Sequence, residues 1–291
     1  MGRKIIITGA SGFLSWHLLQ ALEPDAEIFC ISRTKPNANR PYTFLPCDIT
    51  DYITLGNYFE DIEPDAVIHT AAISDANLCQ QDKEKSYAVN VEATKNLAGL
   101  CCDYNIPFVF TSTDLVFDGL KGNYTEEDSP NPVNAYGEQK AIAEQEVTRI
   151  YPPATIARLP LMFGYAEAGN SNYLQKFVQG LKQGQPAKLF TDEYRSVCGA
   201  TSVSKGIIQL LGYAGVIHIA GPEKLSRYQF GLLAAEAYKL DKTLLQRCLQ
   251  ADVQMAAPRP PDVTLNISKA ISLGYKPLSV EQELQMVAGK Y

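Results

Sequence analysis

An apolar strand that runs into a glycine turn opens the chain and restricts its fold more than any other feature. Lys4–Thr8 is almost wholly apolar, and Gly9 and Gly12 follow it before a helical pattern begins at Phe13. Glycine at such a turn allows positive φ and lets a pyrophosphate approach the backbone closely. The N-terminus of the next helix offers unpaired N–H groups and a positive dipole end to an anion. The pattern predicts a dinucleotide-binding strand–turn–helix unit.

The first half of the chain alternates short apolar strands with helical patterns, as a parallel sheet with helices on both faces does. Several strands are near-continuous apolar runs, which is expected where both faces of a sheet are covered. The expected strands are Lys4–Thr8, Glu27–Ser32, Tyr42–Leu45, Ala66–His69, Pro107–Ser112 and Ala154–Leu159. The expected helices are Phe13–Leu22, Ile53–Ile62, Lys83–Tyr104 and Ala135–Ile150. The predicted fold class is α/β, a doubly wound parallel sheet of the Rossmann type.

After Leu161 the strict alternation ends. The predicted helices are Asn170–Gly184, Ser202–Leu211, Arg227–Lys239 and Val280–Ala288, and the strand-like segments are Leu189–Arg195 and Val216–Ile219. We expect residues 1–160 to form the nucleotide-binding domain, to which a segment of about 197–219 returns. Residues 161–196 and 220–291 are expected to form a smaller α/β substrate lobe. A cleft between the two parts is a natural ligand site.

The bulk composition is that of an ordinary globular protein. Of its 291 residues 46% are hydrophobic and 20% charged, and the formal net charge of -6 argues against a nucleic-acid partner. No apolar run approaches the ~20 residues that span a bilayer. Met1–Lys4 leads directly into a strand without the apolar region of a signal peptide. We therefore expect a cytoplasmic protein that binds neither nucleic acid nor membrane.

The cysteines and histidines do not suggest a metal site. The cysteines number seven, an odd count, and no pair has Cys-x-x-Cys spacing. The three histidines are scattered at no ligand spacing. Free, mostly buried thiols and no bound metal are expected.

Tyr136 and Lys140 lie four residues apart, so a helix would project them from the same face. Reduction of a ketone needs a proton at the carbonyl oxygen, and the pKa of a free tyrosine, about 10, is high for that task. A nearby lysine cation lowers such a pKa. Thr113, at the end of the fifth strand, would hydrogen-bond the substrate oxygen, with Ser112 as a neighbour or substitute. These residues predict a carbonyl reductase in which Tyr136 gives the proton, and Lys140 lowers the tyrosine pKa and holds the nicotinamide ribose.

The end of the second strand indicates which cofactor is used. An enzyme that uses NAD usually has an acidic residue ~20 positions after the glycines, to bond the ribose 2′-hydroxyl. Here the stretch Ile31–Lys35 contains no carboxylate, and Arg33 is suited to a 2′-phosphate, with Ser32 and Lys35 assisting. NADP, as NADPH, is the expected cofactor, and NAD is the less favoured one. Asp48, after the third strand, either meets the adenine ring or caps the following helix.

Together these motifs resemble the extended short-chain dehydrogenases/reductases of the NAD-dependent epimerase/dehydratase superfamily. The nearest sub-family is that of dTDP-4-dehydrorhamnose reductase, which also includes the regulatory β subunit of methionine adenosyltransferase. The resemblance covers nearly the whole chain, and its most specific part is the Ser-Thr-Asp-x-Val-Phe element. The matching segments are Thr8–Leu14, His69–Ala72, Ser112–Gly119 and Tyr136–Lys140, with weaker echoes at Asn90, Arg158–Pro160, Arg259–Pro260 and Leu265–Asn266.

The resemblance implies roles for further residues. Ala71, Ala72 and Ile73 would line the cofactor channel, and Asn90 would support the loop above it. The whole implied cofactor set is Gly9, Ser11, Gly12, Phe13, Leu14, Arg33, Asp48, Ile49, Ala71, Ala72, Asn90, Ser112, Tyr136 and Lys140. The implied substrate-binding set is Ser112, Asp114, Asn172, Arg195 and Arg259. The implied partner is a second copy of the chain, paired through helices that include the one carrying Tyr136.

Alternative roles remain open for some of these residues. Asn172 is equally suited to cap a helix, and Arg195 and Arg259 to form structural ion pairs. The sequence departs from the family at two places. Ser15 replaces a third glycine, which predicts a slightly wider spacing between helix and strand. The segment Asp192–Thr201 lacks a Pro-Thr pair that is expected near its end. The nucleotide-binding domain therefore matches the family better than the substrate lobe.

The leading hypothesis is an NADP-dependent reductase that acts on a carbonyl of a nucleotide-linked deoxysugar. A second is an NAD-dependent nucleotide-sugar epimerase or dehydratase, although a dehydratase needs an acid–base pair and only Asp114 lies next to Thr113. A third is a non-catalytic, NADP-binding regulatory subunit, against which the intact Thr113, Tyr136 and Lys140 argue.

Overall fold

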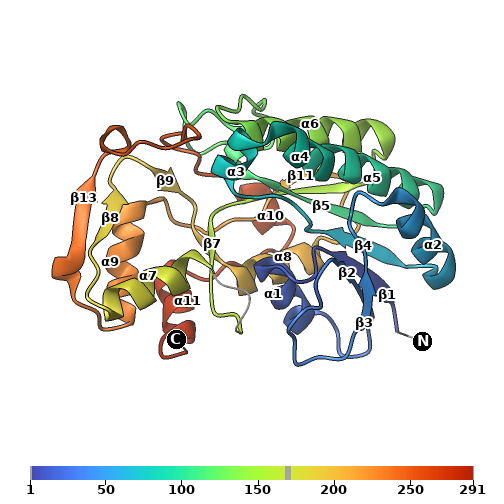
Figure 1. Ribbon diagram of the computed structural model, residues 1–291, viewed down its shortest axis with the longest axis horizontal. Helices are drawn as coiled ribbons and strands as arrows, with labels where there is room; N and C mark the ends of the chain where they lie inside the picture. The colour runs from blue at the N-terminus through green and yellow to red at the C-terminus, as the bar shows by residue number, and fades with distance from the viewer. Residues whose placement is uncertain (1, 168–171, 291) are drawn as a thin grey trace.

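A seven-stranded parallel sheet forms the centre of the computed structural model, which describes residues 2–167 and 172–290. The strand order β11-β6-β5-β4-β1-β2-β3 reverses direction between β4 and β1, and ligands bind beside such a switch point in open α/β sheets. The predicted doubly wound α/β sheet is thus confirmed (Figure 1). The strands are β1 (Lys4–Thr8), β2 (Glu27–Ser32), β3 (Thr43–Pro46), β4 (Ala66–His69), β5 (Phe108–Thr113), β6 (Thr155–Leu159) and β11 (Gly215–His218).

Helices cover both faces of this sheet because its strands bury alternate side chains on opposite sides. In β1, Ile5 and Ile7 belong to a core with α1 (Phe13–Ala21), α8 (Ala200–Gln209) and α10 (Ser268–Ser272). Ile6 belongs to the opposite core, with α2 (Tyr52–Ile62), α5 (Ala93–Asp103) and α6 (Ala135–Ile150). In Figure 1, α5 and α6 lie above the sheet, and α1 and α8 below it.

The segment predicted as one helix, Lys83–Tyr104, is interrupted. It consists of α4 (Lys83–Tyr87), a π-helical stretch (Ala88–Glu92) and α5, and a short helix that was not predicted, α3 (Ala76–Gln81), precedes it. Asp75 and Asp82 each accept backbone N–H groups and begin α3 and α4. The π-helical stretch contains the buried Asn90, and such insertions are frequent at functional sites.

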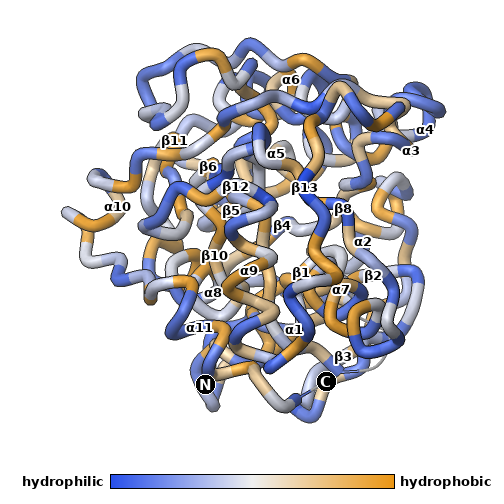
Figure 2. Tube along the Cα trace, turned by 90° about the vertical axis from the view of Figure 1, so that its left-hand side faces the viewer, coloured by the Kyte–Doolittle hydropathy of each residue, from blue (hydrophilic) through white to orange (hydrophobic). Residues whose placement is uncertain are grey.

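A smaller lobe stands beside the sheet, at the left of Figure 1. Its core joins α7 (Tyr173–Lys182), α9 (Arg227–Ala237) and α11 (Val280–Val287) to the parallel pair β8 (Ala187–Phe190) and β13 (Leu245–Cys248). Figure 2 shows α7 alternating between hydrophobic and hydrophilic residues, and its buried residues are hydrophobic. The predicted start of this helix, Asn170, lies outside the described residues.

Short elements connect the lobe to the sheet. They are β7 (Met162–Phe163) beside β10 (Cys198–Gly199) and β9 (Tyr194–Arg195) beside β12 (Leu225–Ser226). The 3-10 turn η2 (Asp114–Val116) follows β5, and the 3-10 turns η3 (Lys242–Leu244) and η4 (Gln250–Asp252) flank β13. Within residues 2–167 and 172–290, no helix is long and apolar enough to cross a membrane. The same residues contain no cluster of histidine, cysteine, aspartate and glutamate placed to hold a metal ion.

Candidate active site

A cavity of about 1090 Å³ lies along the carboxyl ends of the central strands. It brings together the glycine turn, the end of β2, the β4 loop, the end of β5 and the start of α6. Of the predicted residues, those that line it are Gly9, Ser11, Gly12, Phe13, Leu14, Ser32, Arg33, Asp48, Ile49, Ala71, Ala72, Ile73, Ser112, Thr113, Asp114, Tyr136, Lys140 and Arg195. Asn90, Asn172, Arg259 and Lys35 are not among its lining residues.

The glycine turn has the geometry of a phosphate cradle. Gly9 adopts a φ of 65°, and a Cβ atom there would lie 2.6 Å from the backbone of Ala71. Gly12 caps α1 without a side chain, so the first backbone N–H groups of that helix stay accessible. The backbone therefore fits a pyrophosphate at this turn.

Ser15, at the place of the third glycine, is accommodated by hydrogen bonds. Its side chain is buried and donates to the Gly9 carbonyl oxygen at 3.0 Å, and its Oγ lies 2.7 Å from Oγ1 of Thr70. The serine thereby ties α1 to the ends of β1 and β4. The departure from the family pattern thus leaves the turn closed by side-chain contacts.

Arg33 and Asp48 line the far end of the cavity. Arg33 is exposed. Asp48 accepts hydrogen bonds from the Thr50 N–H at 3.0 Å and hydroxyl at 2.8 Å. These bonds lower the pKa of Asp48, and the Arg33 charge lowers it further. Asp48 is not the cap of the following helix, because Asp51 accepts the N–H of Thr54 and caps α2.

Thr113 and Tyr136 meet at the centre of the cavity. Thr113 ends β5, and Tyr136 lies in the first turn of α6, where Asn134 caps the helix by accepting the Gly137 N–H at 2.9 Å. A Cβ atom on Gly137 would lie 2.1 Å from the carbonyl oxygen of Leu115. Glycine therefore lets α6 rest on the backbone after β5, and a side-chain hydrogen bond joins Tyr136 to Thr113. The role of Gly137 was missed in the sequence, where it reads only as a poor helix former.

The predicted lowering of the Tyr136 pKa by Lys140 is wrong, because the pKa is raised. Burial raises the pKa of Tyr136, and the nearby Cys79 and Asp114 raise it further. The hydrogen bond to Thr113 and the charge of Arg195 lower this pKa but do not outweigh the burial. The prediction assumed that helical spacing alone brings the ammonium to the phenol. The phenol is therefore protonated at neutral pH, as a proton donor must be.

The Lys140 ammonium lies 4.0 Å from the centre of the Phe110 ring. Burial lowers the pKa of Lys140 to about 7, although Glu144 and Cys79 act in the opposite direction. The lysine is only 2% exposed, yet it lines the cavity. The protein interior therefore disfavours the charged form of Lys140, and the amino group lies against Phe110 at the wall of the cavity.

A buried polar network beneath the site was not predicted. Glu144 accepts hydrogen bonds from the Ser112 hydroxyl at 2.5 Å and from Nη2 of Arg158 at 2.8 Å. Nη1 of Arg158 lies 3.4 Å from Nε2 of His218, whose pKa burial lowers to about 3. Ser112 is thus engaged with Glu144, which leaves Thr113 as the hydroxyl beside Tyr136. The four residues lie on four different elements, β5, α6, β6 and β11, so spacing gave no signal.

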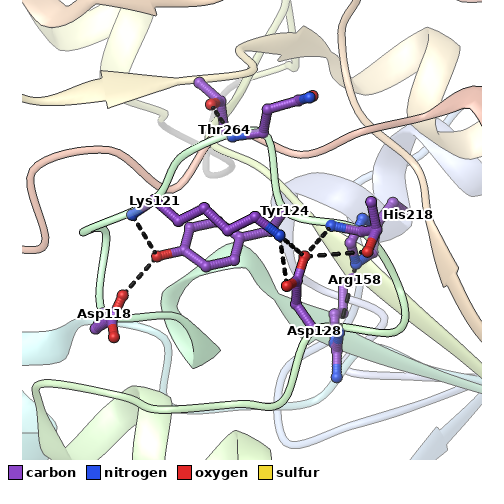
Figure 3. A network of polar contacts seen from close by, with 9 residues as sticks. Asp118, Lys121, Tyr124, Asp128, Arg158, His218 and Thr264 are labelled. Atoms are coloured by element: carbon purple, nitrogen blue, oxygen red, sulfur yellow. Dashed lines mark hydrogen bonds and ion pairs between the residues drawn. The ribbon is translucent and has the colours of Figure 1, made fainter.

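The loop from β5 to α6 is held by the contacts drawn in Figure 3. The Tyr124 hydroxyl donates to Asp118. In addition to the contacts drawn there, Tyr124 stacks on Phe117 with ring centroids 4.1 Å apart. Lys121 pairs with Asp128, and the Tyr124 N–H donates to the Thr264 carbonyl oxygen at 2.8 Å. These contacts fix the segment that delivers Tyr136.

Asn90 supports the β4 loop without lining the cavity. Its amide oxygen accepts the Ile73 N–H at 2.9 Å, and its amide nitrogen donates to the Ile73 carbonyl oxygen at 3.0 Å and to Gln139 at 2.9 Å. The cofactor role implied for it is therefore indirect, through the loop that contains Ile73.

The predicted substrate residues are divided between cavity and scaffold. Asp114 and Arg195 both line the cavity and bond each other at 2.6 Å. Asn172 caps α7 by accepting the Gln175 N–H, and it donates to the Gly164 carbonyl oxygen. Arg259 bonds Asn77 at 3.4 Å. The structure thus brings Asp114 and Arg195 to the reaction centre and places the other two outside the cavity lining.

Comparisons with known proteins agree with this geometry. The family model for the RmlD substrate binding domain matches residues 3–291. A probable low-salt glycan biosynthesis reductase from Haloferax volcanii is 31% identical over 286 residues, which are 96% of this chain and 95% of that protein. Methionine adenosyltransferase 2 subunit beta of Danio rerio is 26% identical and covers 96% of this chain and 86% of its own.

Among solved structures, a dTDP-4-dehydrorhamnose reductase from Bacillus anthracis in complex with NADP has a TM-score of 0.89 at 22% identity, over 99% of both chains. This likeness concerns the fold. Fold, site and relatives together define an NAD(P)-dependent oxidoreductase of the extended short-chain dehydrogenase/reductase type. Within that class, the chain belongs to the RmlD substrate binding domain family, which is the dTDP-4-dehydrorhamnose reductase-like one.

Proposed function

We propose that this protein is an NADP-dependent reductase of a carbonyl on a nucleotide-linked deoxysugar. The observation that carries the proposal is the meeting of Tyr136, Thr113 and Lys140 in one cavity with the Gly9–Gly12 turn. A reduced nicotinamide cofactor, when bound there, supplies the hydride. The protein's own residues do the remaining work.

In this mechanism the Tyr136 hydroxyl donates its proton to the substrate carbonyl oxygen as negative charge develops on it. Burial keeps the phenol protonated, and the Thr113 hydroxyl aligns the same oxygen. Lys140, buried against Phe110, adds a positive charge that stabilises the phenolate left behind. Its ammonium also suits the hydroxyls of a nicotinamide ribose.

The choice of NADP over NAD rests on the far end of the cavity. Arg33 is exposed, lines the cavity there and can pair with a 2′-phosphate through charge-assisted hydrogen bonds. The Bacillus anthracis relative was solved with NADP. A nucleotide-sugar suits the size of the cavity, since about 1090 Å³ exceeds what one small ligand needs.

A two-stage experiment tests this function. The protein is first screened by thermal unfolding against nucleotides and nucleotide-sugars with NADPH present, because ligands that bind only the folded state raise its apparent stability. Each stabilising 4-keto sugar nucleotide is then assayed for NADPH oxidation. Consumption of NADPH with one of them is expected. Co-purified NAD with no net NADPH consumption would instead favour an epimerase or dehydratase.

A second candidate is a cofactor-binding regulatory subunit, favoured by the similarity to methionine adenosyltransferase 2 subunit beta. In that role the chain would bind NADP and stabilise a larger enzyme without turnover of its own. Tagged protein that copurifies with such an enzyme and raises its activity would support this role. We also propose a homodimer in the cytoplasm, which sedimentation and fractionation would test.

A further inference from the structure

One buried ion pair joins the two parts of the molecule next to the reaction centre. Asp114 begins η2 directly after Thr113, and Arg195 ends β9 beside the smaller lobe. Nη1 of Arg195 lies 2.6 Å from Oδ1 of Asp114, and the two side chains are 10% and 2% exposed. A desolvated pair of this kind holds both groups in a defined geometry.

The same carboxylate oxygen also receives the catalytic hydroxyl. Thr113 donates from Oγ1 to Oδ1 of Asp114 at 3.2 Å, while its own Oγ1 accepts the Leu115 N–H at 3.2 Å. A threonine hydroxyl has a single proton to donate. While that proton points at Asp114, it does not reach a carbonyl oxygen in the cavity. Whatever controls the acceptor strength of Oδ1 therefore controls the direction of the Thr113 hydroxyl.

We propose that Asp114 and Arg195 are positioning residues that set the orientation of the Thr113 hydroxyl and make it depend on the seating of the smaller lobe. Oδ1 of Asp114 holds the Thr113 side chain in the rotamer that faces the cavity, so without this carboxylate Oγ1 is free to rotate away. By bonding the same Oδ1, Arg195 weakens it as an acceptor, and the Thr113 proton can then turn to the substrate. Because Arg195 comes from the segment that precedes β10, a shift of this segment changes the reaction centre directly. The proposal rests on the reductase function proposed above.

Glu193 provides a matched control for the experiment. Its Oε1 lies 3.5 Å from Nε of Arg195, and it is buried like Asp114. The cluster thus contains two carboxylates and one guanidinium. Removing either acid leaves Arg195 with one partner and removes the same charge, but only Asp114 touches Thr113.

The test compares Asp114→Ala with Glu193→Ala in steady-state reduction. We expect Asp114→Ala to lower kcat by about 10–100-fold with the KM for NADPH unchanged, since misplacement of a reacting group costs that much. Glu193→Ala is expected to keep kcat close to wild type, and Asp114→Asn to recover part of the loss. In a Thr113→Val background, Asp114→Ala should have no further effect on kcat.

Three results would overturn the proposal: equal losses in the two alanine variants, a loss that appears only in the KM for the sugar, or a full loss that persists in the Thr113→Val background. If wild-type protein shows no reductase turnover, the proposed function itself fails. Crystal structures of wild type and Asp114→Ala then decide the inference: a changed Thr113 rotamer supports it, and an unchanged one refutes it. Thermal unfolding of each variant shows that it is folded.

Discussion

A Cβ atom on Gly137 would lie 2.1 Å from the carbonyl oxygen of Leu115, so the first turn of α6 rests directly on the backbone that follows Thr113. No side chain larger than hydrogen fits between these two segments without moving one of them. The distance between the phenol of Tyr136 and the hydroxyl of Thr113 therefore depends on a glycine that takes no part in the chemistry.

We predict that Gly137→Ala destabilises the fold by about 1–3 kcal/mol, because backbone must move to admit the methyl group. Turnover should fall as well, since Tyr136 moves with the helix. The control is Gly99→Ala in α5, where a Cβ atom meets nothing within 4 Å. That variant should gain roughly 0.5–1 kcal/mol in helix stability. Urea unfolding measures the stability of both variants, and an equal change in the free energy of unfolding would contradict the packing argument.

Arg33→Gln should raise the KM for NADPH about 10–100-fold and leave the KM for NADH almost unchanged, because only NADPH has the 2′-phosphate that the guanidinium would bond. Lys35→Gln is the control, since Lys35 is exposed and is not among the residues lining the cavity. A similar rise for both cofactors in Arg33→Gln would place the arginine away from the 2′ position.

Lys140→Met should change the pH dependence of stability. Burial lowers the pKa of Lys140 from 10.5 to about 7, so between these values the unfolded chain binds more protons than the folded one. The wild type therefore gains stability as pH rises from 7 towards 10.5 and has the full cost of a buried charge below 7.

The free energy of unfolding of Lys140→Met should accordingly exceed that of the wild type most at pH 6. This difference should narrow by roughly 3–5 kcal/mol as pH approaches 10. Denaturant unfolding at pH 6 and pH 9.5 measures this margin. A margin independent of pH would mean that the pKa of Lys140 is the same in the folded and the unfolded chain.

Glu144→Gln should destabilise the protein by about 3–5 kcal/mol, because it leaves the guanidinium of Arg158 buried without its charge partner. Glu146→Gln, two residues along α6, removes a half-buried carboxylate paired with the exposed Arg149 at the surface, and we expect no measurable change. Both variants are compared by denaturant midpoint. A loss of similar size at the two positions would show that helix propensity, not the buried pair, is responsible.

The sequence allowed the sheet and much of the reaction centre to be predicted, because these depend on local patterns. Apolar runs mark strands, and helical spacing puts Tyr136 and Lys140 on one helix. Contacts between distant segments could not be predicted from the sequence: Asp114 and Arg195 are 81 positions apart, and nothing between them signals that the two meet. Side-chain environment was equally hidden, so the pKa of Tyr136 was predicted in the wrong direction.

Helix boundaries failed where one polar side chain decides them. Asp48 and Asp51 are both suitable caps in the sequence, yet only Asp51 meets a free helical N–H. In the same way, Asp75 begins the short helix α3, which the hydrophobic pattern did not predict. Such choices depend on where the preceding strand ends in space.

The central claim, that Tyr136 gives the proton to the substrate carbonyl, is tested most directly by Tyr136→Phe. NADPH affinity, measured by fluorescence titration, should stay close to wild type because the phenyl ring keeps the packing. Turnover with the reducible sugar nucleotide should fall by about 10²–10⁴-fold, the usual contribution of a positioned acid. Turnover equal to that of the wild type, with cofactor binding intact, would contradict the account.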